Sequence, residues 1–171
     1  MDDFLERYTK PGSSKGYEIC KKQEEMEPEE IWMREPQLQC DEELTFYEEV
    51  FEFVMADLEK IKAKGIITEG AAYLPKLMKK LGVSKDRYLA ITPTKDFQIE
   101  HYSRREWVPF VLEGCSDKEK AFSNWMSRDA LFAKEVQRQC AEEQYVSFVN
   151  DGNTKVDEMV EMVASYLGLG D

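Results

Sequence analysis

Three arginines are the residues of this sequence that are best suited to binding phosphate. Arg104 and Arg105 are adjacent, and Arg128 lies further along the chain. A guanidinium group donates charge-assisted hydrogen bonds to phosphate oxygens, which is the stabilisation that a transferring phosphoryl group requires. The alternative is a solvated helix face on which the arginines pair with acids such as Glu100 and Asp129. Spacing alone leaves both interpretations open and favours the helix face.

Three carboxylates could hold magnesium or accept a proton from an attacking hydroxyl. Glu69 follows the short β-branched run Ile66–Thr68, and open α/β sheets place their ligand crevice where strands end. Glu69 could equally cap the helix that follows it. Asp2 and Asp3 have the same two interpretations, with the functional one weakened by their position near a chain end.

The other side chains that could do chemistry favour packing roles. His101 is the only histidine, and a nucleophilic pairing would require the fold to bring a cysteine or serine to it. Trp32, Trp107 and Trp125 could stack on a base, but tryptophans at helical spacing more often fill a core.

The composition excludes several classes of partner. The four cysteines contain no Cys-x-x-Cys pair and there is only one histidine, so we expect no structural metal. A net charge of −12 argues against binding to nucleic acid or to an anionic membrane. The longest uncharged apolar run, Val108–Leu112, is far short of a membrane span. These features predict a cytoplasmic protein with reduced thiols.

The pattern of apolar residues predicts an alternation of strands and helices. Strands are expected over Ile66–Thr68, Tyr88–Thr92 and Tyr145–Val149. Helices are expected over Asp41–Lys64, Leu74–Leu81, Asp96–Leu112 and Asp117–Glu142, with a last helix capped by Thr154. Strands of this apolar character that alternate with helices are typical of a parallel sheet covered on both faces.

We therefore predict a single α/β domain over residues 1–171, with three layers, long helices and a small parallel sheet of about three strands. Residues 1–40 form an irregular and helical lead-in, and 41–114 hold the long helix and two strand-helix units. A helical region over 115–142 and a last strand and helix over 143–171 complete it.

The stretch Lys10–Gly16 is the nearest approach to a phosphate-binding loop. The pattern G-x-x-x-x-G-K-[ST] requires a second glycine where this chain has Tyr17, and an apolar strand where the chain has charged residues. We interpret the stretch as an ordinary loop. The chain is therefore not expected to bind a nucleoside triphosphate unaided.

Four segments together resemble the later two-thirds of the P-loop nucleoside and nucleotide kinases, such as adenylate kinase and shikimate kinase. They are Thr68-Glu69-Gly70-Ala71-Ala72-Tyr73-Leu74-Pro75; Ile91-Thr92-Pro93-Thr94 with the helix containing His101-Tyr102-Ser103-Arg104-Arg105-Glu106-Trp107; the lid-like Ala121-Phe122-Ser123-Asn124-Trp125-Met126-Ser127-Arg128-Asp129; and Phe148-Val149-Asn150-Asp151-Gly152. The resemblance covers roughly residues 41–169 and rests on their order and on short motifs.

The resemblance implies a partial P-loop kinase-like fold and a role for named residues. Glu69, Arg104 and Arg128 would belong to a phosphoryl-transfer site, and Arg105, Asp2 and Asp3 would contact phosphate or substrate. ATP and Mg²⁺ would be the cofactors and a small molecule the phosphate acceptor. Asp2 and Asp3 would match the acidic end of the family's second strand.

The strand and glycine-rich loop that open such kinases would then lie outside this sequence, so we expect the chain alone to be inactive. In the family that strand lies between those that match Ile66–Thr68 and Tyr88–Thr92. Its absence would leave strand edges unpaired, which predicts a closed-up sheet or a homodimer formed by edge pairing or segment exchange. The alternative is a non-catalytic protein-interaction module that uses the apolar face of the helix over 41–64.

Overall fold

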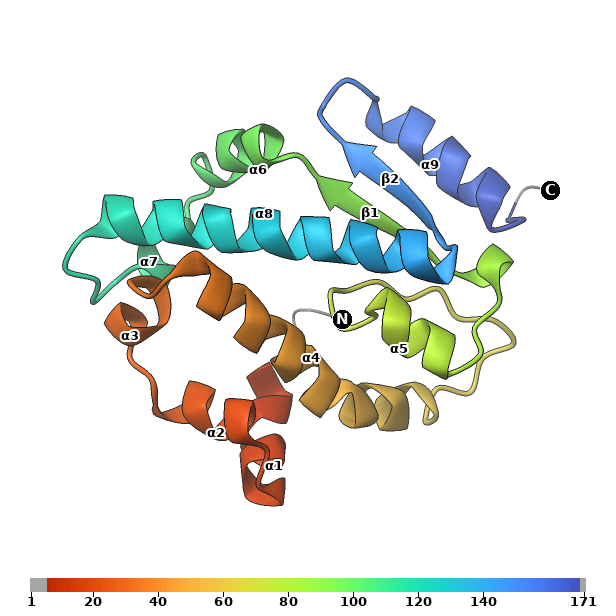
Figure 1. Cartoon of the computed structure of the whole chain (residues 1–171). Coiled ribbons are helices and arrows are strands. Elements are labelled where there is room, and N and C mark those ends of the chain that lie inside the picture. The colour runs from red at the N-terminus through yellow and green to blue at the C-terminus, as the bar shows by residue number, and fades with distance from the viewer. Residues whose placement is uncertain (1–5, 170–171) are drawn as a thin grey trace.

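The chain is mostly helical and contains one small parallel sheet (Figure 1). The structure is a computed structural model, and it describes residues 6–169. The helices are α1 (Glu6–Lys15), α2 (Glu18–Glu25), α3 (Pro28–Trp32), α4 (Pro36–Leu58), α5 (Pro75–Lys80), α6 (Lys95–Tyr102), α7 (Val108–Val111), α8 (Lys118–Glu143) and α9 (Val156–Tyr166). The strands are β1 (Leu89–Pro93) and β2 (Val146–Asn150). The expected α/β class with a parallel sheet is confirmed.

The register of the two strands assigns their side chains to two faces. Thr92 pairs with Val149 and Ile91 with Phe148, and paired residues of a sheet point to the same side. Gln137 of α8 donates to the Thr92 hydroxyl at 2.7 Å, so this face meets α8. The ring of Phe148 contacts Tyr166 of α9, so the opposite face meets α9. The sheet therefore lies between α8 and α9.

Helix α8 is the central element of the fold. It lies between the sheet and α4 in Figure 1, and it contacts α3, α4, α5, α6 and both strands. Its N-terminus is capped by Asp117, whose carboxylate accepts from the backbone N–H of Lys120 at 2.9 Å. Two apolar clusters form along it, one around Val50 and Val54 of α4 and one around Trp125 and Met126 of α8 itself.

No helix within residues 6–169 is long and apolar enough to cross a membrane.

The prediction of a loop over Lys10–Gly16 was wrong, because the helix α1 continues to Lys15. Pro11 lies inside α1 and removes one hydrogen bond, but α1 is held by the buried Tyr8, whose ring stacks on Phe53 of α4 at 5.9 Å. Gly12 lies so close to Cys20 of α2 that an added Cβ would be 2.4 Å from its sulfur. Tight helix packing therefore uses this glycine.

The prediction of a strand over Ile66–Thr68 was also wrong, and with it the expectation of three strands. The described sheet has two strands, and Ile66–Thr68 is irregular and exposed. β-Branched residues favour a strand only where a neighbouring strand completes the hydrogen bonds. Neither strand of the described sheet pairs with this segment, so its β propensity does not lead to a strand.

Three predicted helix boundaries need correction. The helix expected over Asp41–Lys64 begins at Pro36 and ends at Leu58. The helix expected over Asp96–Leu112 divides into α6 and α7, because Pro109 lacks the N–H that an unbroken helix would use and sits in the first turn of α7 instead. The cap expected at Thr154 is replaced by Lys155, whose side chain makes no capping bond.

The remaining elements lie within about two residues of their predicted bounds, as is usual for helix ends. These are β1, β2, α5, α8 and the body of α9. Gly82 ends the α5 turn in the left-handed backbone region at a φ of +73°, which glycine adopts without strain.

We predict that Met126→Ala destabilises the chain by about 2–5 kcal/mol, because Met126 is only 1% exposed in the cluster around Trp125. Met162→Ala is the matched control, since Met162 of α9 is 41% exposed and should cost under about 0.5 kcal/mol. Urea unfolding followed by tryptophan fluorescence measures both. Equal losses for the two variants would contradict the assigned core.

Candidate functional site

Arg128 is held inside the chain by two carboxylates. Its side chain is 13% exposed, and its NH1 lies 2.7 Å from Oε2 of Glu43 on α4. Its Nε lies 2.6 Å from Oδ1 of Asp129, as an ion pair without hydrogen-bond geometry. The guanidinium also lies over the ring of Trp32 at 5.3 Å from the centroid. Two carboxylates and one aromatic ring therefore surround the cation, and its Nε has no hydrogen-bond partner.

The surroundings of this cluster keep Arg128 charged. Burial alone lowers the pKa of the Arg128 guanidinium, but Glu43 and Asp129 outweigh it and raise that pKa above its usual value. Burial raises the pKa of the Asp129 carboxyl. Tyr47 donates to Glu43 at 2.6 Å, and Gln98 of α6 donates to Asp129. The cluster therefore joins α4, α6 and α8 by charge-assisted contacts.

A phosphate could reach Arg128 only by displacing one of these carboxylates. The sequence left open that Arg128 pairs with Asp129 on a solvated helix face. The structure contains this pair, but Arg128 is only 13% exposed, so the expected solvated face is wrong. Removing an acid from a buried arginine is costly, because it leaves an uncompensated charge. We therefore interpret Arg128 as a residue that holds the helices together.

Arg104 and Arg105 lie just beyond α6, and both are exposed. Arg104 is 72% exposed and pairs with Glu100 one turn earlier at 2.8 Å. The Arg105 guanidinium lies 5.0 Å from the centroid of Tyr102 and 5.7 Å from that of Trp107. Arg104 can leave its surface ion pair at little cost, so it is the most available of the three candidate arginines to a ligand.

Glu69 does not join the arginines. It lies on the exposed segment before α5, and that segment does not end a strand. The ion pairs of Arg104 and Arg128 are with Glu100, Glu43 and Asp129. Asp2 and Asp3 lie outside the described residues. The structure therefore does not bring the three predicted catalytic residues together.

The packing interpretation is confirmed for Trp125 and for Trp32, which is partly buried against it, but Trp107 is 41% exposed and does not fill a core. Trp125 is buried, with Trp32 at 4.7 Å and Trp107 at 5.9 Å between ring centroids. The His101 ring packs on Phe97 at 4.1 Å. Trp32, Trp107 and Trp125 therefore form one ring cluster that joins α3 and α8 to the segment before α7.

One buried amide and one partly buried amide form polar contacts that the sequence pattern did not reveal. Asn124 of α8 donates to the backbone carbonyls of Trp32 and Arg34 at 3.0 and 3.2 Å. Gln39 of α4 donates to the Arg34 carbonyl at 2.8 Å. Both amides satisfy carbonyls in the connection between α3 and α4. A polar residue on an otherwise apolar helix face is the only sequence signal for such a role.

The four cysteines are buried and unpaired: Cys20, Cys40, Cys115 and Cys140. Burial raises the pKa of the Cys20 thiol to about 12 and those of Cys40 and Cys140 to about 11. They are therefore protonated near neutral pH and poor nucleophiles. Within residues 6–169 no group of three or more His, Cys, Asp or Glu side chains could hold a metal ion.

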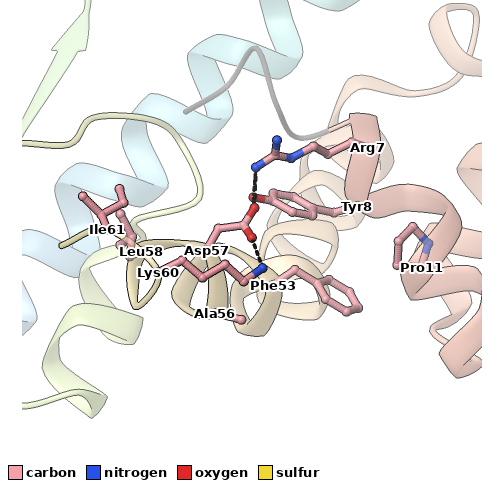
Figure 2. Close-up of a pocket in the computed structure, with 9 residues that line it drawn as sticks. All are labelled: Arg7, Tyr8, Pro11, Phe53, Ala56, Asp57, Leu58, Lys60 and Ile61. Atoms are coloured by element: carbon pink, nitrogen blue, oxygen red, sulfur yellow. Dashed lines mark hydrogen bonds and ion pairs between the residues drawn. The ribbon is translucent and has the colours of Figure 1, made fainter.

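An open pocket of about 630 Å³ lies between α1 and the end of α4 (Figure 2). Its lining residues are Arg7, Tyr8, Pro11, Phe53, Ala56, Asp57, Leu58, Lys60 and Ile61. At its centre Asp57 accepts from Tyr8 at 2.6 Å, from Lys60 at 2.7 Å and from Arg7. Hydrogen bonds from Lys60 and Tyr8 lower the pKa of the Asp57 carboxyl to about 2. So strongly stabilised a carboxylate is a poor base.

The apolar face of the helix over 41–64 is used within the chain. Val50 and Val54 are fully buried, and α4 contacts α1, α2 and α8. The interaction-module alternative would need this face to be free, and the described packing leaves little of it.

A comparison with known protein families found no matching family, and comparisons with curated proteins and with solved structures found no match.

We predict that Arg128→Ala lowers the free energy of unfolding by about 3–5 kcal/mol, because it leaves the partly buried carboxylates of Glu43 and Asp129 without their cation. Arg104→Ala, which removes only a surface pair, should cost under about 0.5 kcal/mol. Thermal and urea unfolding compare the two. A near-neutral Arg128→Ala would contradict the structural role.

We also predict a stability loss in acid that depends on Asp57. The folded pKa of Asp57, about 2, lies below its usual value of 3.8. The carboxylate therefore stabilises the chain above the usual value, and this contribution disappears as the pH falls through the folded pKa.

Urea unfolding at several pH values between 5 and about 2 should show wild type losing its advantage over Asp57→Asn as the pH falls. A difference between wild type and variant that does not change with pH would disprove the assigned hydrogen bonds.

Proposed function

We propose that this chain is part of a P-loop kinase-like domain, related to ATP-dependent small-molecule or nucleoside kinases, and that it does not catalyse phosphoryl transfer by itself. The observation that carries the proposal is the order of elements around the sheet. β1 leads through α6, α7 and α8 to the parallel strand β2, and α9 then covers the opposite face. This is the arrangement that the resemblance implies for the later part of such a kinase.

The uncovered half of the sheet supports the view that this domain is incomplete. α9 contacts Phe148 of β2, but Ile91 on the same face of β1 is 47% exposed. On α9, Val156 and Val160 are 79% and 59% exposed. Parallel sheets are normally covered on both faces, so a further helix would fit against these residues.

The edge of β1 supports the same view. β1 pairs with β2 on one side only. In the resembled kinases the strand that carries the phosphate loop lies beside the strand that matches β1. A strand, a phosphate loop and a helix would together complete the pairing and cover Ile91.

The described residues do not fit ATP and Mg²⁺ as they stand. Arg128 is neutralised by Glu43 and Asp129, and Glu69 contacts neither Arg104 nor Arg128. The one glycine-rich stretch is part of α1. In the proposed complete domain we assign the phosphate contact to Arg104. Arg104 is exposed, and it lies just after α6, the helix that follows β1.

Translation of the genomic DNA upstream of Met1 tests the proposal. We expect an apolar strand followed by G-x-x-x-x-G-K-[ST], in frame or nearly so. The longer chain should then transfer phosphate from ATP, and Arg104→Ala should lower its kcat by about 100-fold or more. Lys118→Ala, at an exposed position of α8, is the control with unchanged kcat.

Upstream DNA that encodes no such strand and loop would contradict the proposal. An unchanged kcat in the Arg104→Ala variant of the longer chain would contradict the role assigned to Arg104.

A further inference from the structure

Helix α9 covers one face of the sheet without burying any of its own residues. The other long helices do bury side chains, for example Val54 on α4 and Trp125 on α8. α9 lies on the side of the strands away from α8 (Figure 1), so it is separated from both apolar clusters. Within residues 6–169 no ion pair involves α9, although its first turn is acidic. The helix is therefore attached through one face alone.

The directed contacts of α9 with the rest of the chain converge on one residue, Tyr166. The ring of Tyr166 meets the ring of Phe148 on β2 at 6.5 Å between centroids. Its hydroxyl donates to the backbone carbonyl of Lys85, which lies just before β1. Within residues 6–169 this is the one side-chain hydrogen bond between α9 and the rest of the chain. The attachment thus depends strongly on Tyr166, in the last turn of the helix.

The chain that enters α9 is held on one side and unsupported on the other. Gly152 has a φ of +86°, and an added Cβ there would lie 2.8 Å from the ring of Phe97 on α6. This close approach fixes the position of Gly152. Lys155, at the N-terminus of α9, is exposed and its side chain makes no capping bond. The backbone at Thr154 and Lys155 is therefore the natural place for a bend.

Burial stabilises the docked position of α9 only weakly. The free energy of burial follows the apolar area removed from water, and Val156, Val160 and Met162 of α9 remain exposed. A detached α9 would not persist as a helix, because it has 11 residues and isolated helices shorter than about 12 are marginal in water. Detachment therefore removes little buried area, and it opens the hydrogen bonds of the helix to solvent.

We propose that α9 is a strap that detaches from the sheet as one unit while the rest of the chain stays folded. Tyr166 is its latch, and Thr154 with Lys155 is its hinge. Phe148 and Ile91 lie on the face of the sheet that meets α9, so detachment uncovers an apolar surface. Opening of this kind requires less free energy than global unfolding. The strap does not require the upstream strand and loop of the proposed function.

Amide hydrogen exchange of the full chain, followed by NMR, tests the strap. We expect the amides from Val160 to Tyr166 to exchange at least about 100-fold faster than buried amides of α8 such as Met126, after correction for intrinsic rates. Their protection should be similar along the helix, because the helix opens as a unit. Protection equal to that of α8, or protection that falls steadily toward one end of α9, would overturn the proposal.

The urea dependence of exchange measures how much surface the opening exposes. Exchange of α9 should accelerate with urea, but with a smaller slope than the amides of α8 that open only on global unfolding. A slope of zero would mean that no apolar face is uncovered. A slope equal to that of α8 would mean that α9 opens only with the whole chain, and either result would contradict the strap.

Two tyrosine variants test the latch. Tyr166→Phe removes the hydrogen bond to Lys85, so exchange of α9 should rise by about 2–10-fold with α8 unchanged. Tyr145→Phe is the matched control, because the buried Tyr145 donates to the Val83 carbonyl at 2.6 Å. It should accelerate the globally exchanging amides of α8 and leave α9 unchanged. An α9 that is insensitive to Tyr166→Phe, or equally sensitive to both variants, would disprove the latch.

The strap and the proposed function fail separately. An upstream strand and phosphate loop combined with an α9 as protected as α8 would remove the strap alone. Independent opening of α9 without such an upstream sequence would leave the strap standing and remove the kinase-like proposal.

Discussion

The fold depends on the constraint that two parallel strands cannot be joined by a tight turn. The chain must travel from the end of β1 back to the start of β2, and it does so through α6, α7 and α8. The return helix α8 lies on the sheet and simultaneously forms the base on which α4 and α5 pack. Helix α8, which the parallel strands require as their connection, is therefore also the centre of the hydrophobic core.

The same helix carries the buried charges. Arg128 holds Glu43 on α4 and Asp129 beside it, while Gln98 of α6 donates to Asp129. Buried ion pairs seldom add net stability over apolar packing, but they fix the relative position of the elements that they join. This role explains why Arg128, which the resemblance assigns to phosphate, pairs instead with carboxylates of the protein itself. It also moves the proposed phosphate contact to the exposed Arg104.

Local sequence patterns predicted those elements whose stability is local or whose pattern is strong. β1, β2, α5 and α8 were recognised from apolar runs and periodicity and from glycines such as Gly82 and Gly114 at their ends. Ile66–Thr68 was misread because strand formation needs a neighbour that a single segment does not reveal. Lys10–Gly16 was misread because the packing of Tyr8 on Phe53 outweighs proline and glycine in a helix.

The candidate site was less predictable than the fold. Nothing in the spacing of Arg128 told whether it would face a ligand or Glu43, because that choice depends on how α4 packs against α8. The pocket around Asp57 likewise combines α1 with the end of α4, which are distant in sequence. Contacts between distant segments form these candidate sites, and a single sequence does not encode such contacts in a readable pattern.

The proposed function depends on β1 having one open edge, and amide hydrogen exchange by NMR tests that directly. β1 has amides at Leu89, Ala90, Ile91 and Thr92, whereas Pro93 has none. We expect two alternate amides to be protected by β2 and the other two to exchange at least about 100-fold faster. Equal protection of all four would show that the outer edge is covered, and would contradict the account.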